Sequence, residues 1–285
     1  MNNTFSIKRF SFVLKKDLLE NGKRYLLYFL TITGIMALII TWCAYDYMRY
    51  SGPREISVLY LNRDLLIYTA FCFMGFGLLF SSVAMDPMRS KTDRISYLIL
   101  PASGFEKYFS RWLIVTIGYI IAFFLALWIA DLIRITVCSA RFPELEIKAL
   151  NLDYLIEPSD ASWEMRREYL IPNEGFRICI SIYFLFQSLF LLGSTYWQKL
   201  SFVKTFAVCG TIITAFILLC RWTILSFYNN DMKAFLNVTN SFGENSGLNN
   251  EQALGVIICT CALFTLGNWV ISYFRFQESE IIRRF

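Results

Sequence analysis

The residues best suited to specific chemistry lie in a charged segment, 86–111, between two apolar stretches. Ser103 is followed three positions later by Glu106. This is the Ser-x-x-Glu pattern of a capping box, in which hydroxyl and carboxylate each accept a backbone N–H at the start of a helix. Pro101 would end a preceding helix, because it has no N–H and restricts the residue before it. The pattern predicts a short helix over 93–100, a turn, and a second helix capped by Ser103.

Five polar residues within long apolar stretches are the next candidates, because burying such groups in lipid is costly. Asp131 and Arg134 lie three apart on one helix face, which predicts an ion pair. Gln187 and Asn268 are predicted to form hydrogen bonds between helices. Arg221 can either extend toward lipid headgroups or face the interior of the bundle.

The chain lacks the residues for several kinds of catalysis. It contains no histidine, which excludes Ser-His and Cys-His nucleophile pairs and histidine zinc sites. It has no Gly-x-x-x-x-Gly-Lys-Ser/Thr loop for nucleotide phosphates. Cys259 and Cys261 would point to different faces of a helix and make a poor metal chelate. We therefore predict no catalytic residues, no metal site, no cofactor and no enzymatic activity.

The elements that carry these residues are apolar stretches of membrane-spanning length. A helix needs roughly 20 apolar residues to cross a hydrocarbon core of about 30 Å and must satisfy its own backbone hydrogen bonds there. Charged residues make up 17% of the chain, against roughly 25% in a soluble domain. We predict an all-α polytopic membrane protein, with residues 25–285 as a single six-helix transmembrane domain. The predicted spans are 25–45, 65–85, 112–133, 178–197, 205–225 and 253–274.

The fifth predicted span, 205–225, has an alternative interpretation. It contains Arg221, and only the short connection 198–204 separates it from the fourth span. Such a link suits two antiparallel neighbouring helices. The alternative for this region is a re-entrant hairpin.

Lys and Arg are concentrated on one predicted side of the membrane. With the N-terminus inside, the inner segments hold 16 Lys and Arg residues in 68 positions, and the outer segments hold 10 in 90. Short cytoplasmic loops carry such an excess in membrane proteins. We therefore predict that both termini are cytoplasmic. The segment 86–111 then lies inside, and the longest connection, 134–177, lies outside.

Residues 1–24 form a cationic lead to the first span. The apolar residues that recur at helical spacing are Phe10, Val13, Leu14 and Leu18. The lysines and arginines lie largely off this face, as in amphipathic helices at the membrane interface whose cations meet anionic headgroups. Two interpretations stay open: a fixed anchor for the first span, or an elbow helix that moves with the bundle.

The order of these elements resembles the permease subunit of ABC-2 type transporters. That order is a basic amphipathic lead, two spans, a charged inner loop with a Leu-Pro-x-Ser-x-x-Glu element, and four more spans. The matching positions are Leu100, Pro101, Ser103, Glu106 and Lys107. The resemblance implies that the loop 86–111 carries a coupling helix that seats in a cleft of a separate ATPase. The chain departs from the commoner pattern in its 44-residue outer loop, 134–177, so no substrate is carried over.

The resemblance also implies a function and partners. The chain would be the permease subunit of an ABC-type exporter, acting as a homodimer or with a second permease among the lipids of the bacterial cytoplasmic (inner) membrane. Two other classes stay open. One is a non-transporting membrane scaffold or sensor that docks a cytoplasmic partner. The other is an ion-coupled secondary transporter that would depend on Asp131. No feature predicts nucleic-acid binding.

Overall fold

The computed structural model is built almost entirely from helices. It describes residues 5–51, 55–88, 91–145, 147–156, 173–197, 199–227 and 250–282. The long helices are α2 (Gly22–Ser51), α3 (Glu55–Ser82), α6 (Tyr119–Arg141), α7 (Asn173–Tyr196), α8 (Ser201–Phe227) and α10 (Asn250–Ile282). The shorter α-helices are α1 (Ile7–Glu20), α4 (Lys91–Leu98) and α5 (Gly104–Leu113). The remaining turns are the 3-10 helices η1 (Asp86–Met88) and η3 (Leu152–Leu155) and the π-helical η2 (Ile114–Gly118).

Within the described part of the chain, six helical runs are long and apolar enough to cross a membrane. They are Gly22–Arg49, Leu61–Met88, Gly104–Arg141, Gly175–Tyr196, Ser201–Phe227 and Glu251–Glu278. Each overlaps one predicted span, in the predicted order. The predicted all-α class with six membrane-length helices is therefore confirmed. Most of the helices extend past the predicted spans, because a helix can continue into water after its apolar residues end.

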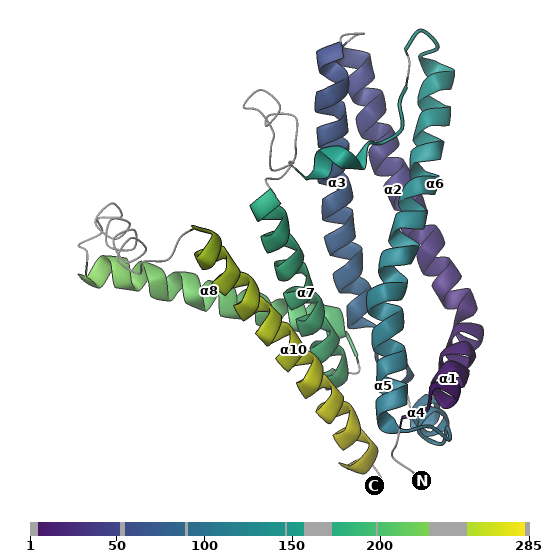
Figure 1. Ribbon diagram of the computed structural model, residues 1–285, viewed down its shortest axis with the longest axis vertical. Coiled ribbons are helices and arrows are strands. Elements are labelled where there is room, and N and C mark those ends of the chain that lie inside the picture. Colours follow the sequence, from purple (N-terminus) through teal and green to yellow (C-terminus); the bar gives the residue numbers. More distant parts are fainter. Residues whose placement is uncertain are drawn as a thin grey trace.

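The helices α2, α3 and α6 stand side by side, and α7 and α10 extend the bundle beyond α3 (Figure 1). Aromatic rings fill the space between α3, α6 and α7. The Phe73 ring centroid lies 4.7 Å from Tyr183 and 5.0 Å from Phe123. The Tyr119 hydroxyl donates to the Phe73 carbonyl at 2.6 Å. Close packing and hydrogen bonds of this kind hold helices together in lipid, where the hydrophobic effect does not act between them.

The third span is the upper part of a much longer helix. The elements α5, η2 and α6 follow one another without a break from Gly104 to Arg141. This confirms the prediction that the helix capped by Ser103 runs directly into the third span. Only the π-helical turn, Ile114–Gly118, departs from regular α-helix geometry in this rod. A π turn of this kind holds one extra residue.

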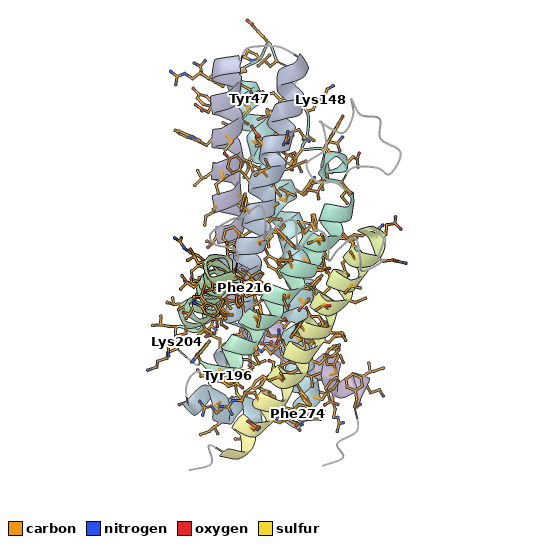
Figure 2. The ribbon with its side chains drawn as sticks, turned by 90° about the vertical axis from the view of Figure 1, so that its left-hand side faces the viewer. Tyr47, Lys148, Tyr196, Lys204, Phe216 and Phe274 are labelled. Carbon is orange, nitrogen blue, oxygen red and sulfur yellow. The ribbon has the colours of Figure 1, made fainter. Side chains whose placement is uncertain are left out.

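The helix α8 leaves the bundle and runs crosswise to α2, α3 and α6 (Figure 1). It is unbroken over Ser201–Phe227, which excludes a hairpin within these residues. Figure 2 shows it nearly end-on, with Phe216 on it. Large apolar side chains are exposed along its length, and a helix that is apolar on all sides is typical of a lipid environment. That α8 crosses the membrane stays a prediction.

A glycine permits the close contact between α7 and α8. A Cβ atom added to Gly193 would overlap the Thr205 hydroxyl and would lie 3.0 Å from Thr205 Cβ. Small residues allow helix backbones to approach closely in membranes. The first turn of α8 therefore lies directly against α7, while the rest of α8 diverges.

We predict that Gly193→Ala destabilises the protein by about 1–3 kcal/mol, because the added methyl group forces the two helices apart. Thermal unfolding of the purified protein in detergent measures this change. Gly210→Ala is the matched control, since a Cβ atom at Gly210 in α8 meets nothing within 4 Å. Equal melting temperatures for the two variants would contradict the proposed contact.

Candidate functional site

Three short helices form a cap at the end of the molecule where both termini lie (Figure 1). We call α1, α4 and α5 the termini-side cap. The helix α1 packs along α5, α4 packs on the η1 turn, and α5 also contacts α10. Because α5 continues into α6, the cap and the membrane bundle share one helix. Most of the cationic lead and most of the charged segment 86–111 fall in this cap.

The predicted capping box is present at the start of α5. The Glu106 N–H donates to Ser103 Oγ at 3.2 Å, and the Ser103 N–H donates to Glu106 Oε2 at 2.9 Å. The other carboxylate oxygen, Oε1, accepts the Ser6 N–H at 2.8 Å and pairs with Arg9 at 3.1 Å. Glu106 is fully buried. One carboxylate therefore holds the first turns of α5 and α1 together.

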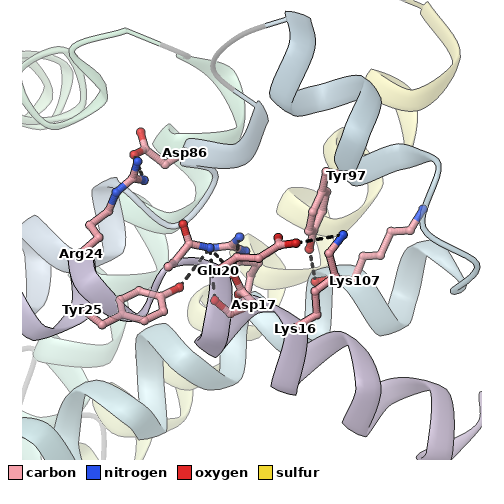
Figure 3. Close-up of polar contacts among 10 residues, drawn as sticks. Lys16, Asp17, Glu20, Arg24, Tyr25, Asp86, Tyr97 and Lys107 are labelled. Carbon is pink, nitrogen blue, oxygen red and sulfur yellow. Dashed lines mark hydrogen bonds and ion pairs between the residues drawn. The ribbon is translucent and has the colours of Figure 1, made fainter.

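Arg111 is the centre of a second polar cluster in the cap, and its partners Asp17, Tyr25 and Tyr97 are labelled in Figure 3. It pairs with Asp17 at 2.6 Å, and both side chains are less than a tenth exposed. It also donates to the Tyr25 hydroxyl at 3.1 Å and lies 5.5 Å from the centroid of the Tyr97 ring. These partners belong to α1, α2 and α4. A single guanidinium on α5 thus contacts three other helices.

Burial shifts the ionisation of this cluster. It raises the pKa of the Asp17 carboxyl above its ordinary value, while Arg111 and the Asn21 amide act in the opposite direction. Burial also raises the pKa of Tyr97 to about 12. Tyr97 is therefore neutral at physiological pH, and its hydroxyl donates to the Lys107 carbonyl at 2.9 Å. This bond fixes α4 to α5.

The helix α4 is held on its inner side and exposed on its outer side. Arg94 donates to the Met88 carbonyl at 2.9 Å, and the buried Tyr97 ring faces α5 and α10. Ile95 and Ile99 are 58% and 74% exposed. Ile99 directly follows the last residue of α4, and its N–H donates to the Ile95 carbonyl at 3.0 Å, so the two side chains continue one helical face. A short, anchored helix that presents an apolar face favours contact with another surface.

The five residues predicted to couple to a partner differ in their exposure to solvent. Pro101 is exposed, Leu100 and Ser103 are partly exposed, and Glu106 and Lys107 are buried. The Glu106 carboxylate is directed at α1, so an effect of this residue on a partner would be transmitted through the cap. The coupling role of the five residues stays a prediction.

The helix α1 turns its predicted apolar face toward α5. Val13 is buried, and the Phe10 ring centroid lies 5.3 Å from that of Phe109. Leu18, which belongs to the predicted face, is 46% exposed, and Phe12 and Leu19 off that face are 71% and 72% exposed. The predicted N-terminal helix is present, and its location at the membrane interface stays a prediction.

Sequence reasoning missed that Asp17, Tyr97 and Arg111 form one buried cluster. A signal for Asp17 was available, because it lies four residues after Val13 on the apolar face of α1. A carboxylate on an apolar face needs a buried partner. Nothing in the local sequence identified Arg111 as that partner.

The predicted ion pair at the far end of the bundle is confirmed. Arg134 Nε lies 2.7 Å from Asp131 Oδ1, and both residues are buried. Each also binds the predicted outer loop: Arg134 donates to the Lys148 carbonyl at 2.7 Å, and Asp131 Oδ2 accepts the Leu150 N–H at 2.9 Å. The ion pair therefore binds the backbone of the segment that follows α6.

We call residues 147–156 the outer strap. Asn62 on α3 makes two further bonds to it: its amide donates to the Asn151 carbonyl at 3.1 Å and accepts the Asn151 N–H at 3.0 Å. The outer strap is thus joined to α6 by the ion pair and to α3 by an asparagine. Much of the remaining outer loop, 157–172, lies outside the described residues.

The other intramembrane candidates lie in different places. Gln187 donates to Thr116 Oγ1 at 3.1 Å, and Asn268 donates to Ser188 Oγ at 3.0 Å. Both predicted interhelical hydrogen bonds are therefore confirmed. Thr116 belongs to the π turn η2, so Gln187 ties α7 to that turn. Arg221 is exposed on α8 and does not face the bundle interior.

No protein-family model, curated protein or solved structure matches this chain. Among the residues that the structure describes, no group of three or more His, Cys, Asp or Glu side chains is placed to hold a metal ion. The termini-side cap is accordingly identified as the candidate site by its geometry: buried polar contacts inside, an exposed apolar face outside, and a continuous helix into the membrane.

We predict that Asp17→Asn destabilises the protein by about 3 kcal/mol or more, because it leaves the Arg111 guanidinium buried without a counter-ion. Replacing both residues, as in Asp17→Asn with Arg111→Met, should cost less than the sum of the two single changes. Unfolding in detergent measures all three variants. Glu20→Gln is the control, since Glu20 is exposed and 3.5 Å from Lys16, so its loss costs about 0–1 kcal/mol. If Asp17→Asn left the stability of the protein unchanged, this would contradict a stabilising ion pair between Asp17 and Arg111.

We predict that Asp131→Asn speeds amide hydrogen exchange across the outer strap, because the Leu150 N–H loses its charged acceptor. Hydrogen exchange with mass spectrometry measures this, and peptides from α1 provide the internal reference. Unchanged exchange at Leu150 would show that the ion pair does not hold the strap.

Proposed function

We propose that this chain is the permease subunit of an ABC-type exporter, driven by a separate ATPase that docks on the termini-side cap. The observation that carries this proposal is the combination of an anchored α4 with an exposed apolar face and a rod, α5 to α6, that leads from the cap into the bundle. A soluble partner that pressed on the cap would act directly on a membrane helix.

The docking surface proposed for the ATPase consists of Ile95, Ile99, Pro101 and Phe105, which we call the coupling surface. All four are exposed, and three are large apolar side chains. Apolar side chains dominate the buried centres of protein interfaces. Glu106 would act behind this surface, because its carboxylate connects α5 to α1.

The contacts inside the cap connect its helices, so we expect the cap to move as one unit when a partner presses on it. Arg111 connects α5 to Asp17 and Tyr25, and Tyr97 connects α4 to α5. A displacement of α4 would therefore move α1, the start of α2 and α5 together. The proposed result is a change in tilt of the second and third predicted spans, which alters access to a path between two permease copies or between this chain and a second permease.

The two alternative functions receive different support. A scaffold or sensor would use the same coupling surface, so only the identity of the partner separates it from a permease. Ion-coupled transport gains no support from Asp131, whose two carboxylate oxygens are occupied by Arg134 and the Leu150 N–H. We also propose the bacterial cytoplasmic membrane as the location, as the resemblance to ABC-2 permeases implies. Both termini would lie inside, because the distribution of Lys and Arg favours that orientation.

The test is purification of the chain from its native membranes, identification of co-purified proteins by mass spectrometry, and reconstitution of the complex in liposomes. We predict that an ABC ATPase co-purifies. The double change Ile95→Asp with Ile99→Asp should weaken the complex and lower ATP turnover at least tenfold, because two charges would be buried in an apolar contact.

Ser11→Asp is the control, since Ser11 is an exposed residue of α1 at the same end of the molecule. Co-purification of a signalling protein without an ATPase would support the scaffold instead. Full turnover in the Ile95→Asp, Ile99→Asp double variant would refute the coupling surface.

A further inference from the structure

A wide apolar groove opens where α8 diverges from α7. Its volume is about 470 Å³. Leu189 and Leu192 on α7 face Val208 and Ile212 on α8 across it. The groove begins at the Gly193 and Thr205 contact, which sets the angle between the two helices. Because both helices are apolar and membrane-length, this groove is suited to a hydrocarbon chain.

The groove has aromatic and cationic residues at one end. Tyr196 and Trp197 line it there, at the end of α7. Lys199 and Lys204 follow in the connection to α8 and in its first turn, and both are exposed. Among the described residues, neither lysine has a carboxylate partner.

We propose that the groove between α7 and α8 binds an anionic phospholipid from the leaflet nearest the two termini. One acyl chain would lie between Leu189, Leu192, Val208 and Ile212. The phosphate would lie at Lys199 and Lys204, with the aromatic rings at the level of the headgroup. Tyrosine and tryptophan prefer this level in membranes, and juxtamembrane lysines attract anionic lipid.

The lysines favour an anionic lipid over the other possible occupants. A zwitterionic lipid such as phosphatidylcholine would fill the groove, but it has no net negative charge to balance the two lysines, since its ammonium group offsets its phosphate. A helix from a second copy of this chain would need to present an apolar face together with an acidic group at one end. Arg275 also lies near this end of the groove, 4.7 Å from the centroid of the Tyr196 ring. Its charge is partly balanced by Glu278, with which it pairs at 2.8 Å.

The proposed lipid site does not depend on the proposed transport function. It needs only that the chain lies in a membrane, which its six apolar helices support. It can therefore be tested on the isolated chain, without an ATPase. Failure of the ATPase to co-purify would leave the lipid result unaffected.

The test is native mass spectrometry of the purified full-length chain, titrated with phosphatidylglycerol or phosphatidylcholine. We expect at least tenfold tighter binding of phosphatidylglycerol, with one high-affinity site. The double change Lys199→Gln with Lys204→Gln should weaken that binding roughly 10- to 30-fold, at about fivefold for each lysine. The matched control is Lys8→Gln with Lys15→Gln, which removes the same charge from exposed positions on α1.

A second pair of variants tests the apolar part of the groove. Ile212→Trp fills it and should abolish the high-affinity site, whereas Leu218→Trp changes an exposed residue of α8 that does not line it and should retain binding. Equal affinities for the two lipids, or equal losses in the two lysine pairs, would overturn the proposal. A dimer mass that is lost in Ile212→Trp but not in Leu218→Trp, without bound lipid, would assign the groove to a second copy.

Discussion

The structure of the termini-side cap depends on one buried ion pair, between Asp17 and Arg111. A buried charge is tolerated only when it is paired, so each residue fixes the position of the other. Asp17 lies near the end of α1, just before the break at Asn21, and Arg111 lies near the end of α5, directly before the predicted third span. Their contact therefore sets where α2 begins relative to α5. The Tyr25 and Tyr97 contacts of Arg111 extend this constraint to α2 and α4.

The two ends of the bundle are held by different means. At the termini end, charged side chains connect helices that are distant in sequence. At the far end, Asp131 and Arg134 hold backbone that follows closely after their own helix. The first arrangement lets separate helices move together, while the second keeps the outer strap on α6. A device that transmits motion from a soluble partner would need a connected inner end and a fixed outer end, which is consistent with the proposed function.

Features that depend on local sequence could be predicted, whereas the partners in distant contacts could not. The Ser103 and Glu106 box and the Asp131 and Arg134 pair were predictable, because both join residues three positions apart. The bond from Ser6 to Glu106 joins residues 100 positions apart, and no local pattern indicates it. The direction of α8 relative to the other helices could not be predicted from the sequence either. A helix that is apolar on every side has no face that specifies its neighbour.

The π turn at Ile114–Gly118 has a consequence for the alignment of the long rod. In a regular helix the buried stripe that contains Lys107 and Arg111 would return near residue 118, whereas the buried residues above the turn are Tyr119, Phe123 and Ala126. One residue corresponds to about 100° of rotation. The extra residue in the turn absorbs that difference. The buried face of the helix in the cap and its buried face in the bundle therefore lie on the same side of the rod. One continuous helix can thus pack in both places without a change in the orientation of the cap relative to the bundle.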